Sequence, residues 1–263
     1  MIGFNYLGKM GQLGNQMFQY ATVLGISRYI GTNFSIPNHT EILRDGLGNN
    51  LRIELFDAFY LKPDNIGFVD AEPTQEKFFH FDVDFLNLDI TTNYNIVGYF
   101  QTEKYFRHAE EEIRDNFVFK DKIKNDCEKI LSTINSPVAL HIRRGDYIIN
   151  SDNHYNLSLD YYANALKYFP NREVIIFTDD PSWVGQQELF SDDRFLISEN
   201  NSSYHDLYLM SRCSDFIIAN STFSWWGAWL SKRGKVIAPK KWFGPALKNN
   251  NTKDLYLKDW VKL

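Results

Sequence analysis

The chain has few cysteines and no long apolar run. Its two cysteines among 263 residues, Cys127 and Cys213, lack the spacing of a metal site or a redox pair. We therefore expect free thiols in a reducing compartment. No run reaches about 18 apolar residues, and the first residues lack a basic segment followed by an apolar one, so we expect neither a membrane span nor a signal peptide. These absences predict a cytoplasmic protein, with at most a peripheral contact at the inner face of a membrane.

Positive charge is also scarce. The 28 Lys and Arg residues are outnumbered by 33 Asp and Glu residues, which gives a net charge of −5. Such a chain has no broad basic face for nucleic acid, so any site for an anion has to be local. No cluster of cysteine and histidine indicates zinc.

The second half of the chain alternates strand and helix signals. Short apolar runs separated by amphipathic stretches are typical of βα repeats, which form a doubly wound parallel sheet. The expected strands are 138–142, 173–178, 194–197, 215–219 and 235–238, and the clearest helices are 157–168 and 204–212.

The first half begins in the same way, with an expected strand at 2–6 and a helix at 15–30. Between residues 33 and 100 the elements are hard to assign, and residues 115–135 have the pattern of one charged helix. Pro137 disfavours helix just before it, so we place a domain boundary near residue 135. The expected domains are 1–135 and 136–245, with the tail 246–263 packing back on the first.

The end of the strand at 138–142 is the most informative segment. Within six residues it presents His141, Arg143, Arg144 and Asp146, and ligands of open α/β sheets bind just beyond the carboxyl ends of strands. Two adjacent guanidinium groups need an anion nearby, and the planar arginine fork suits a phosphate. We expect one arginine to pair with Asp146, specifically Arg144, and the other to face a phosphate-type anion.

Two further turns offer groups for a ligand. A loop with Gly8, Gly11 and Gly14 lies between an expected strand and a helix, where backbone amides can receive phosphate or sugar. It matches neither the dinucleotide fingerprint nor the P-loop, and a tight turn alone would also require glycine. After the strand at 215–219, Ser221, Thr222 and Ser224 can cap the following helix, bind a diphosphate, or do both.

Acidic pairs occur at two places. Asp179 and Asp180 follow the strand at 173–178, and Pro181 after them favours a helix cap. Asp82 and Asp84 form an Asp-x-Asp, which can chelate a divalent cation on a nucleotide-sugar diphosphate. The alternating residues around this pair also fit an exposed strand or loop face, and we favour that interpretation.

Several segments resemble motifs of glycosyltransferase family 11, the alpha-1,2-fucosyltransferases of bacteria and animals. They are residues 11–21 (Gly-Gln-Leu-Gly-Asn-Gln-Met-Phe-Gln-Tyr-Ala), 98–106 (Gly-Tyr-Phe-Gln-Thr-Glu-Lys-Tyr-Phe), 141–147 (His-Ile-Arg-Arg-Gly-Asp-Tyr) and 220–226 (Asn-Ser-Thr-Phe-Ser-Trp-Trp). The tail with Asp254, Leu255, Tyr256 and Trp260 is also similar to the family.

This resemblance implies an α/β fold of GT-B type, with two Rossmann-like domains facing a cleft. The domain 136–245 would bind GDP-fucose and the domain 1–135 would lie on the acceptor side. The implied reaction is a metal-independent, inverting transfer of L-fucose to the 2-hydroxyl of a terminal β-galactoside on a glycan. It needs no cofactor beyond GDP-fucose itself.

The resemblance also implies roles for individual residues. Arg143 would contact the β-phosphate, His141 would lie near the nucleotide, and Asp206 would hold the guanine. The expected catalytic set is Arg143, Asp146 and His141, and the expected donor-binding set is Gly14, Asn15, Arg143, Arg144, Asp206, Ser221, Thr222 and Ser224. Asp152 is not assigned as a base, because its register does not match the acid of related fucosyltransferases.

Two rival interpretations stay open. One is a metal-dependent GT-A transferase that uses Asp82 and Asp84, and loss of activity in EDTA would support it. The other is a catalytically silent protein that binds a sugar nucleotide, which single-turnover transfer would exclude.

Overall fold

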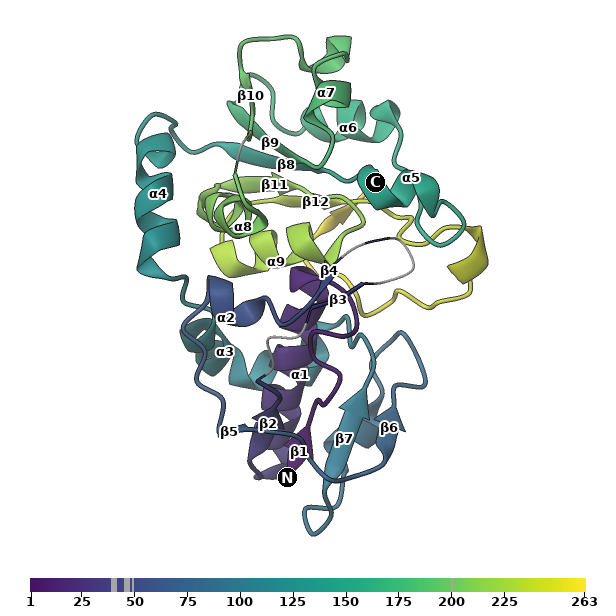
Figure 1. The fold of residues 1–263 in the computed structure, drawn as a ribbon. Helices are drawn as coiled ribbons and strands as arrows, with labels where there is room; N and C mark the ends of the chain where they lie inside the picture. The colour runs from purple at the N-terminus through teal and green to yellow at the C-terminus, as the bar shows by residue number, and fades with distance from the viewer. Residues whose placement is uncertain (39–41, 45–47, 49, 200) are drawn as a thin grey trace. The chain divides into compact units, whose positions relative to one another are not determined.

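The computed structural model describes residues 1–38, 42–44, 48, 50–199 and 201–263 (Figure 1). The chain forms two compact units, and both have the predicted α/β architecture. The first unit comprises Met1–Lys120 and Asn250–Leu257, and the second comprises Asp121–Asn249 and Lys258–Leu263. Cys127 and Cys213 are free thiols, as predicted, and both are buried.

Within the described residues of the first unit, five strands form a parallel sheet in the order β5-β2-β1-β7-β6. The strands of this sheet are β1 (Ile2–Gly3), β2 (Phe34–Ile36), β5 (Asn65–Ile66), β6 (Pro73–Gln75) and β7 (Tyr94–Val97). A separate antiparallel pair joins β3 (Leu43–Arg44) to β4 (Asn50–Leu51). The helices are α1 (Leu13–Ile30), α2 (Leu55–Ala58) and α3 (Glu110–Asn116), with 3-10 turns η1 (Val83–Leu86), η2 (Glu103–Tyr105) and η3 (Arg107–Ala109).

Helix α1 is the centre of the first unit. Nearly all of its side chains from Leu13 to Ser27 are buried, polar ones such as Gln16 and Gln19 included, so it is covered on every side. It ends at Gly31, whose left-handed backbone (φ 76°) closes the last turn. In the part of the chain that the structure describes, no helix combines the length and the apolar character that a bilayer span requires.

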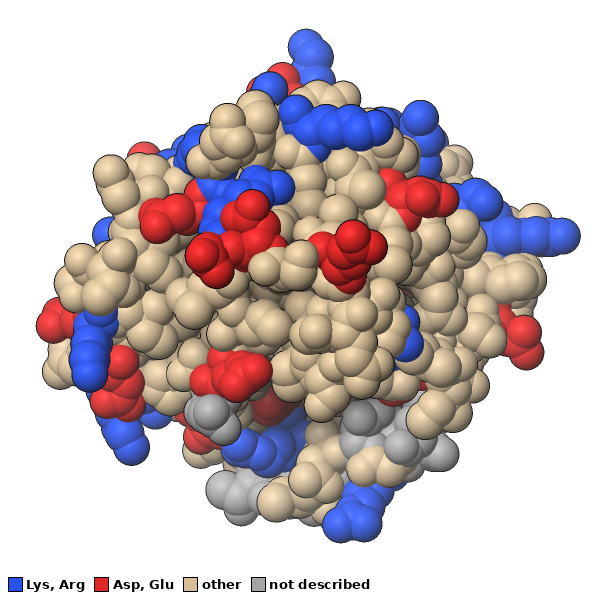
Figure 2. Space-filling model, turned by 90° about the horizontal axis from the view of Figure 1, so that it is seen from above, with Lys and Arg blue, Asp and Glu red and all other residues tan. Residues whose placement is uncertain are grey.

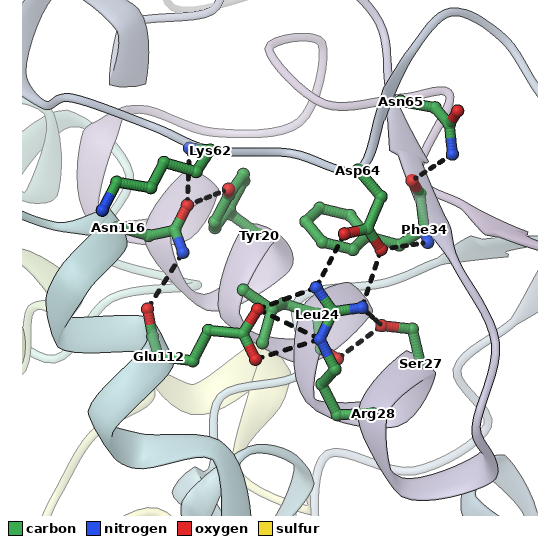
Figure 3. A network of polar contacts seen from close by, with 10 residues as sticks. All are labelled: Tyr20, Leu24, Ser27, Arg28, Phe34, Lys62, Asp64, Asn65, Glu112 and Asn116. Carbon is green, nitrogen blue, oxygen red and sulfur yellow. Dashed lines mark hydrogen bonds and ion pairs between the residues drawn. The ribbon is translucent and has the colours of Figure 1, made fainter.

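A network around Arg28 fastens the second half of α1 (Figure 3). The Arg28 guanidinium lies 2.7 Å from Asp64, just before β5, and 2.7 Å from Glu112 on α3. The hydrogen bonds from Arg28 lower the pKa of Asp64 below its ordinary value. Two turns earlier on α1, the Tyr20 hydroxyl donates to the side-chain oxygen of Asn116 on α3 at 2.6 Å. The helix is therefore tied to both the sheet edge and α3.

Within the described residues of the second unit, six strands form a parallel sheet in the order β10-β9-β8-β11-β12-β13. The strands are β8 (Val138–Ile142), β9 (Val174–Thr178), β10 (Phe195–Ile197), β11 (Asp215–Ile217), β12 (Val236–Ala238) and β13 (Val261–Lys262). The helices are α4 (Asp121–Leu131), α5 (Gly145–Ile149), α6 (Leu159–Leu166), α7 (Pro181–Val184), α8 (Ser203–Arg212) and α9 (Thr222–Ser231), with η4 (Glu188–Phe190) and η5 (Pro245–Leu247).

Helices α6 and α7 cover one face of this second sheet, and α8 and α9 cover the other (Figure 1). On the first face, Tyr161 and Tyr162 of α6 pack against buried aliphatic side chains of β8 and β9. The strand order reverses between β8 and β11, because β9 and β10 continue on one side and β12 and β13 on the other. Such a reversal opens a crevice at the carboxyl ends of the two strands, where ligands of open α/β sheets bind.

The division between the units lies at Lys120, ahead of the expected boundary near residue 135. The single charged helix expected at 115–135 is interrupted, because residues 117–120 leave the helix to pair with residues 58–60. Phe119 bridges Phe59, and the Lys120 N–H donates to the Ala58 carbonyl at 3.0 Å. Helix α4 then packs on α8 within the second unit. The tail is also divided, since 250–257 belong to the first unit and β13 extends the second sheet.

Candidate functional site

The carboxyl end of β8 holds Arg143 between two carboxylates. Residues Ile142 and Thr178 are register partners in β8 and β9, so the residues after them, Arg143 and Asp179, lie side by side. Arg143 Nη1 is 3.2 Å from Asp179 Oδ2, and Nη2 is 2.7 Å from Asp146 Oδ1. Burial lowers the pKa of Arg143, but attraction to the two acids outweighs it and raises the pKa above its ordinary value. The guanidinium is therefore a permanent cation.

Asp179 was not among the predicted site residues, yet it organises this turn. Its Oδ1 accepts a hydrogen bond from the Arg144 N–H at 2.8 Å, while Oδ2 faces Arg143. A Cβ added to Gly145 would lie 2.7 Å from Asp179 Oδ2, so the glycine of the motif makes room for this carboxylate. Asp179 is placed beside the motif by the register of β8 against β9, which the sequence alone does not reveal.

Arg144 points away from the Arg143 pair. Its Nε lies 3.1 Å from Asp180 Oδ2, and its guanidinium carbon is 3.9 Å from the centroid of the Trp183 ring. The prediction that Arg144 pairs with Asp146 is therefore wrong. Residues 143 and 146 are three apart along the chain, and their side chains meet at the start of α5, whereas Arg144, directly before the helix, has a backbone (φ −129°, ψ −64°) that is neither helical nor extended.

Asp180 caps α7, as predicted. Its Oδ1 accepts a hydrogen bond from the Trp183 N–H at 3.0 Å, and Pro181 occupies the first helical position. The same carboxylate binds Arg144 through its other oxygen. One acidic residue thus fixes both the helix start and the second arginine of the motif.

His141 lies inside β8 and is only 5% exposed. Burial, aided by the charge of Arg143, lowers its pKa to about 3, so the imidazole is neutral at neutral pH. Its ring packs at 5.5 Å from Phe223 of α9, and no described residue hydrogen-bonds its Nδ1. A buried ring nitrogen without a protein partner is available to a ligand or a water molecule.

The turn from β11 into α9 lies beside β8, and its three hydroxyls are in different environments. The fully buried Ser224 donates to the Ser221 carbonyl at 3.2 Å, so its hydroxyl faces the helix backbone. Ser221 precedes the helix and interacts with the Tyr147 side chain, and Thr222 is partly exposed. The first amides of α9 have no intrahelical partners and carry the positive end of the helix dipole.

Asp206 lies in a separate cavity of about 380 Å³ at the carboxyl ends of β9 and β10. The cavity is lined by Thr178, Pro181, Ser182, Ser198, Glu199, Asn201 and Asp206. The Ser198 hydroxyl donates to Asp206 Oδ1 at 2.7 Å, and Asn201 donates to Ser198 at 2.9 Å. Burial raises the pKa of Asp206 above its ordinary value. Ser198 therefore holds the Asp206 carboxyl in place, and the carboxyl can still accept further hydrogen bonds.

Gly14 and Asn15 belong to the first unit, at the start of α1. The Asn15 side-chain oxygen accepts a hydrogen bond from Gln101 at 3.1 Å. Gly8 and Gly11 have positive φ angles of 82° and 81°, as the tight-turn interpretation of this loop requires. The buried Gln19 of α1 stabilises this turn, because its side-chain amide donates a hydrogen bond to the Met10 carbonyl at 3.0 Å.

The Asp-x-Asp stretch forms the start of η1, in which Asp84 is exposed but Asp82 is only 7% exposed, so the expected exposed strand or loop face is wrong for Asp82. Asp82 Oδ1 accepts a hydrogen bond from the Asp84 N–H at 3.1 Å and so caps η1. Across the described ranges, no group of three or more His, Cys, Asp and Glu side chains could hold a metal ion. Metal-independent transfer stays a prediction.

The sequence profile of Glycosyl transferase family 11 matches residues 2–263. The chain belongs to glycosyltransferase family 11. Among its relatives, the O-antigen biosynthesis glycosyltransferase WbnK of Escherichia coli is 32% identical over 200 residues, and an Alpha-1,2-colitosyltransferase of Escherichia coli is 33% identical over 192 residues. Each alignment covers 68% of this chain and 65% of the relative. Galactoside alpha-(1,2)-fucosyltransferase 1 of Rattus norvegicus is 24% identical, with 84% of this chain and 62% of that protein covered.

Solved structures show that this family 11 chain has the GT-B fold. NodZ alpha-1,6-fucosyltransferase soaked with GDP-fucose superposes with a TM-score of 0.57 at 14% identity, covering 91% of this chain and 94% of that one. POFUT1 in complex with GDP gives a TM-score of 0.51 at 14% identity, with 90% and 97% covered. At these identities the likeness concerns the fold alone.

In this family 11 protein the predicted site residues fall into three groups. Seven of them come from the crevice of the second unit and its adjoining turn: His141, Arg143, Arg144, Asp146, Ser221, Thr222 and Ser224. Asp206 lies in the neighbouring cavity, while Gly14 and Asn15 lie in the other unit. The face of the described residues drawn in Figure 2 has Lys and Arg interspersed with Asp and Glu rather than one broad basic area.

Proposed function

We propose that the protein is an inverting glycosyltransferase that moves L-fucose from GDP-fucose to the 2-hydroxyl of a terminal β-galactoside. The observation that carries this proposal is that Arg143 follows β8 and the start of α9 follows β11, and these two strands are parallel neighbours at the strand reversal. Membership of family 11 and the names of its α-1,2-transferring relatives support the same reaction.

The diphosphate binds between Arg143 and the first turn of α9. The guanidinium has five N–H donors, and the two carboxylates contact it through one oxygen each, so donors remain for phosphate oxygens. The amides before and within the first turn, near Ser221 and Thr222, add the positive end of the helix dipole. The neutral His141 has its unpartnered nitrogen in the same crevice and can accept or donate a hydrogen bond there.

Breaking the bond between fucose and GDP places extra negative charge on the β-phosphate. Arg143 and the α9 amides are fixed in position before that charge develops, so they stabilise the transition state more than the ground state. The same positive groups stand where a divalent ion would act in a metal-dependent transferase. Transfer by this protein therefore proceeds without an added metal.

The guanine base occupies the cavity around Asp206. A carboxylate can accept hydrogen bonds from the guanine N1–H and N2–H, and adenine offers no matching pair of donors. Ser198 already occupies one oxygen of Asp206, which orients the carboxyl within the cavity. Preference for GDP over other nucleotides follows from this single residue.

Transfer of colitose from its GDP derivative is a second candidate, favoured by the 33% identity to an Alpha-1,2-colitosyltransferase. The test is incubation with GDP-fucose or GDP-colitose, a panel of β-galactosides, and linkage analysis of the product, with and without EDTA. We expect an α-1,2-fucosylated product in both conditions. A chain that loses activity in EDTA, or releases no GDP with any acceptor, would contradict the proposal. Product from GDP-colitose alone would establish the second candidate.

A further inference from the structure

His154 stands next to the arginine motif although the motif does not include it. Its imidazole stacks face to face on the Tyr147 ring, with the ring centroids 4.0 Å apart and the planes at 7°. The Arg143 guanidinium carbon lies 5.6 Å from the centroid of that same Tyr147 ring. The imidazole and the Arg143 guanidinium, the group proposed to bind phosphate, thus both lie against the Tyr147 ring.

The surroundings fix this stack firmly. The Tyr147 hydroxyl donates to the Asn220 carbonyl at 3.0 Å, immediately before the turn into α9. The His154 N–H donates to the Asn150 carbonyl at 3.0 Å, and the His154 backbone also bridges Phe243. The backbone and the ring face therefore hold the imidazole, and its nitrogens are not needed for that purpose.

No described residue makes a hydrogen bond to either ring nitrogen of His154, and the side chain is partly exposed. The other histidines of the second unit differ, because His205 is hydrogen-bonded to Ser202 and Asp126, and His141, which also has an unpartnered Nδ1, is buried. A held, partly exposed imidazole with unused nitrogens can take part in proton transfer.

The charges around His154 suit a proton acceptor. Burial and the charge of Arg143 lower its pKa below the ordinary histidine value, while Asp146 acts in the opposite direction. The ring is therefore neutral at neutral pH, and Asp146 can stabilise the imidazolium once it forms. On the neighbouring segment, Lys241 lies over the Tyr155 ring at 4.8 Å from its centroid, and Phe243 is apolar.

We propose that His154 is the catalytic base that takes the proton from the acceptor hydroxyl. This role rests on the proposed transfer reaction. The O–H bond of the acceptor breaks and its proton passes to a ring nitrogen of His154, while the oxygen forms a bond to the anomeric carbon of the donor sugar. The bond from that carbon to the β-phosphate oxygen breaks, and GDP leaves with the electron pair. The imidazolium then releases its proton to solvent.

Three variants test this role: His154→Ala, His154→Phe and, as a matched control two residues away, the exposed Asp152→Asn. His154→Phe keeps an aromatic ring on Tyr147 and removes the nitrogens, so it separates proton transfer from stacking. We expect both His154 variants to lose about 10²-fold or more in kcat while binding GDP nearly as well as the parent, by calorimetry. Asp152→Asn should stay within a few-fold of the parent.

Two further measurements complete the test. The acid limb of the kcat–pH profile should disappear in the His154 variants, and added imidazole should partly restore turnover in His154→Ala. Near-normal turnover of His154→Phe, or an unchanged acid limb, would overturn the role in catalysis and leave the transfer reaction intact. A parent chain inactive with every donor and acceptor would overturn the proposed function, and this role with it.

Discussion

Replacing Arg143 tests whether a fixed guanidinium stabilises the departing GDP. Arg143→Ala removes a cation that lies 2.7 Å from Asp146 and 3.2 Å from Asp179. Loss of one preorganised donor to a developing oxyanion costs about 3–4 kcal/mol in the transition state. We therefore expect kcat to fall by roughly two to three orders of magnitude.

The alanine variant also leaves two carboxylates facing each other without their cation. Asp146 and Asp179 are 20% and 24% exposed, so water screens part of their repulsion. We expect the free energy of unfolding to fall by about 1–3 kcal/mol, less than the loss seen when fully buried ion pairs are broken. Thermal unfolding of the variant sets the temperature at which its activity can be measured on folded protein.

Arg143→Lys separates charge from geometry in the same position. Lysine keeps a positive charge, but its compact ammonium cannot contact both carboxylates and present parallel donors to a phosphate. We expect it to recover most of the lost stability and little of the lost turnover, measured by steady-state kinetics with GDP-fucose and by calorimetry with GDP. Near-normal turnover of Arg143→Lys would refute the bidentate argument. A loss confined to KM would refute the argument from the transition state.

Three further outcomes are expected. Arg144→Ala should lower Tm, and a double-mutant cycle should give coupling of about 0.5–1 kcal/mol with Asp180 and none with Asp146; the reverse pattern would contradict the observed pairing. Glu76 follows β6 and accepts hydrogen bonds from the Tyr99 and Phe100 N–H groups. Burial raises the pKa of Glu76 to about 7, so its contribution to stability is fully present below pH about 4.5 and is lost as pH rises through about 7. Glu76→Gln should therefore flatten the decline of unfolding free energy between pH 5 and pH 8 seen in denaturant titrations, and an unchanged slope would contradict this. Asp206→Asn should reduce the preference for GDP over ADP by about tenfold or more in calorimetric titrations, and equal preferences in parent and variant would remove Asp206 from base recognition.

The central strands of the second sheet could be predicted closely because they are buried on both faces. The strand expected at 138–142 is β8 itself, since a parallel strand covered by helices reads as a continuous apolar run that ends abruptly at charged residues. The first sheet was harder to predict. Several of its strands are two or three residues long, which is too short for a periodic pattern to emerge.

The motif residues could be predicted from the sequence, but their pairing could not. Which arginine meets Asp146 depends on the backbone of Arg144 and on the register of β9, and neither leaves a local pattern in the sequence. The contact of Asp179 with Arg143 could not be predicted either, because it depends on the same register of β8 against β9. His154 gave no signal either, because its relation to Tyr147 depends on how the segment after α5 folds back along Phe243.

The arginine motif is incomplete by itself, because one of the two carboxylates that hold Arg143 is Asp179, which follows β9. Residues 141–147 carry the signature, yet the position of the Arg143 guanidinium depends on Asp179. Gly145 leaves the space that the Asp179 carboxylate, at the end of the next strand, occupies. A designer who transplanted residues 141–147 into another parallel sheet would therefore obtain an arginine without its support. The smallest transferable unit is two adjacent strands with their following turns, and a side chain at 145 should be tolerated only together with a smaller residue at 179.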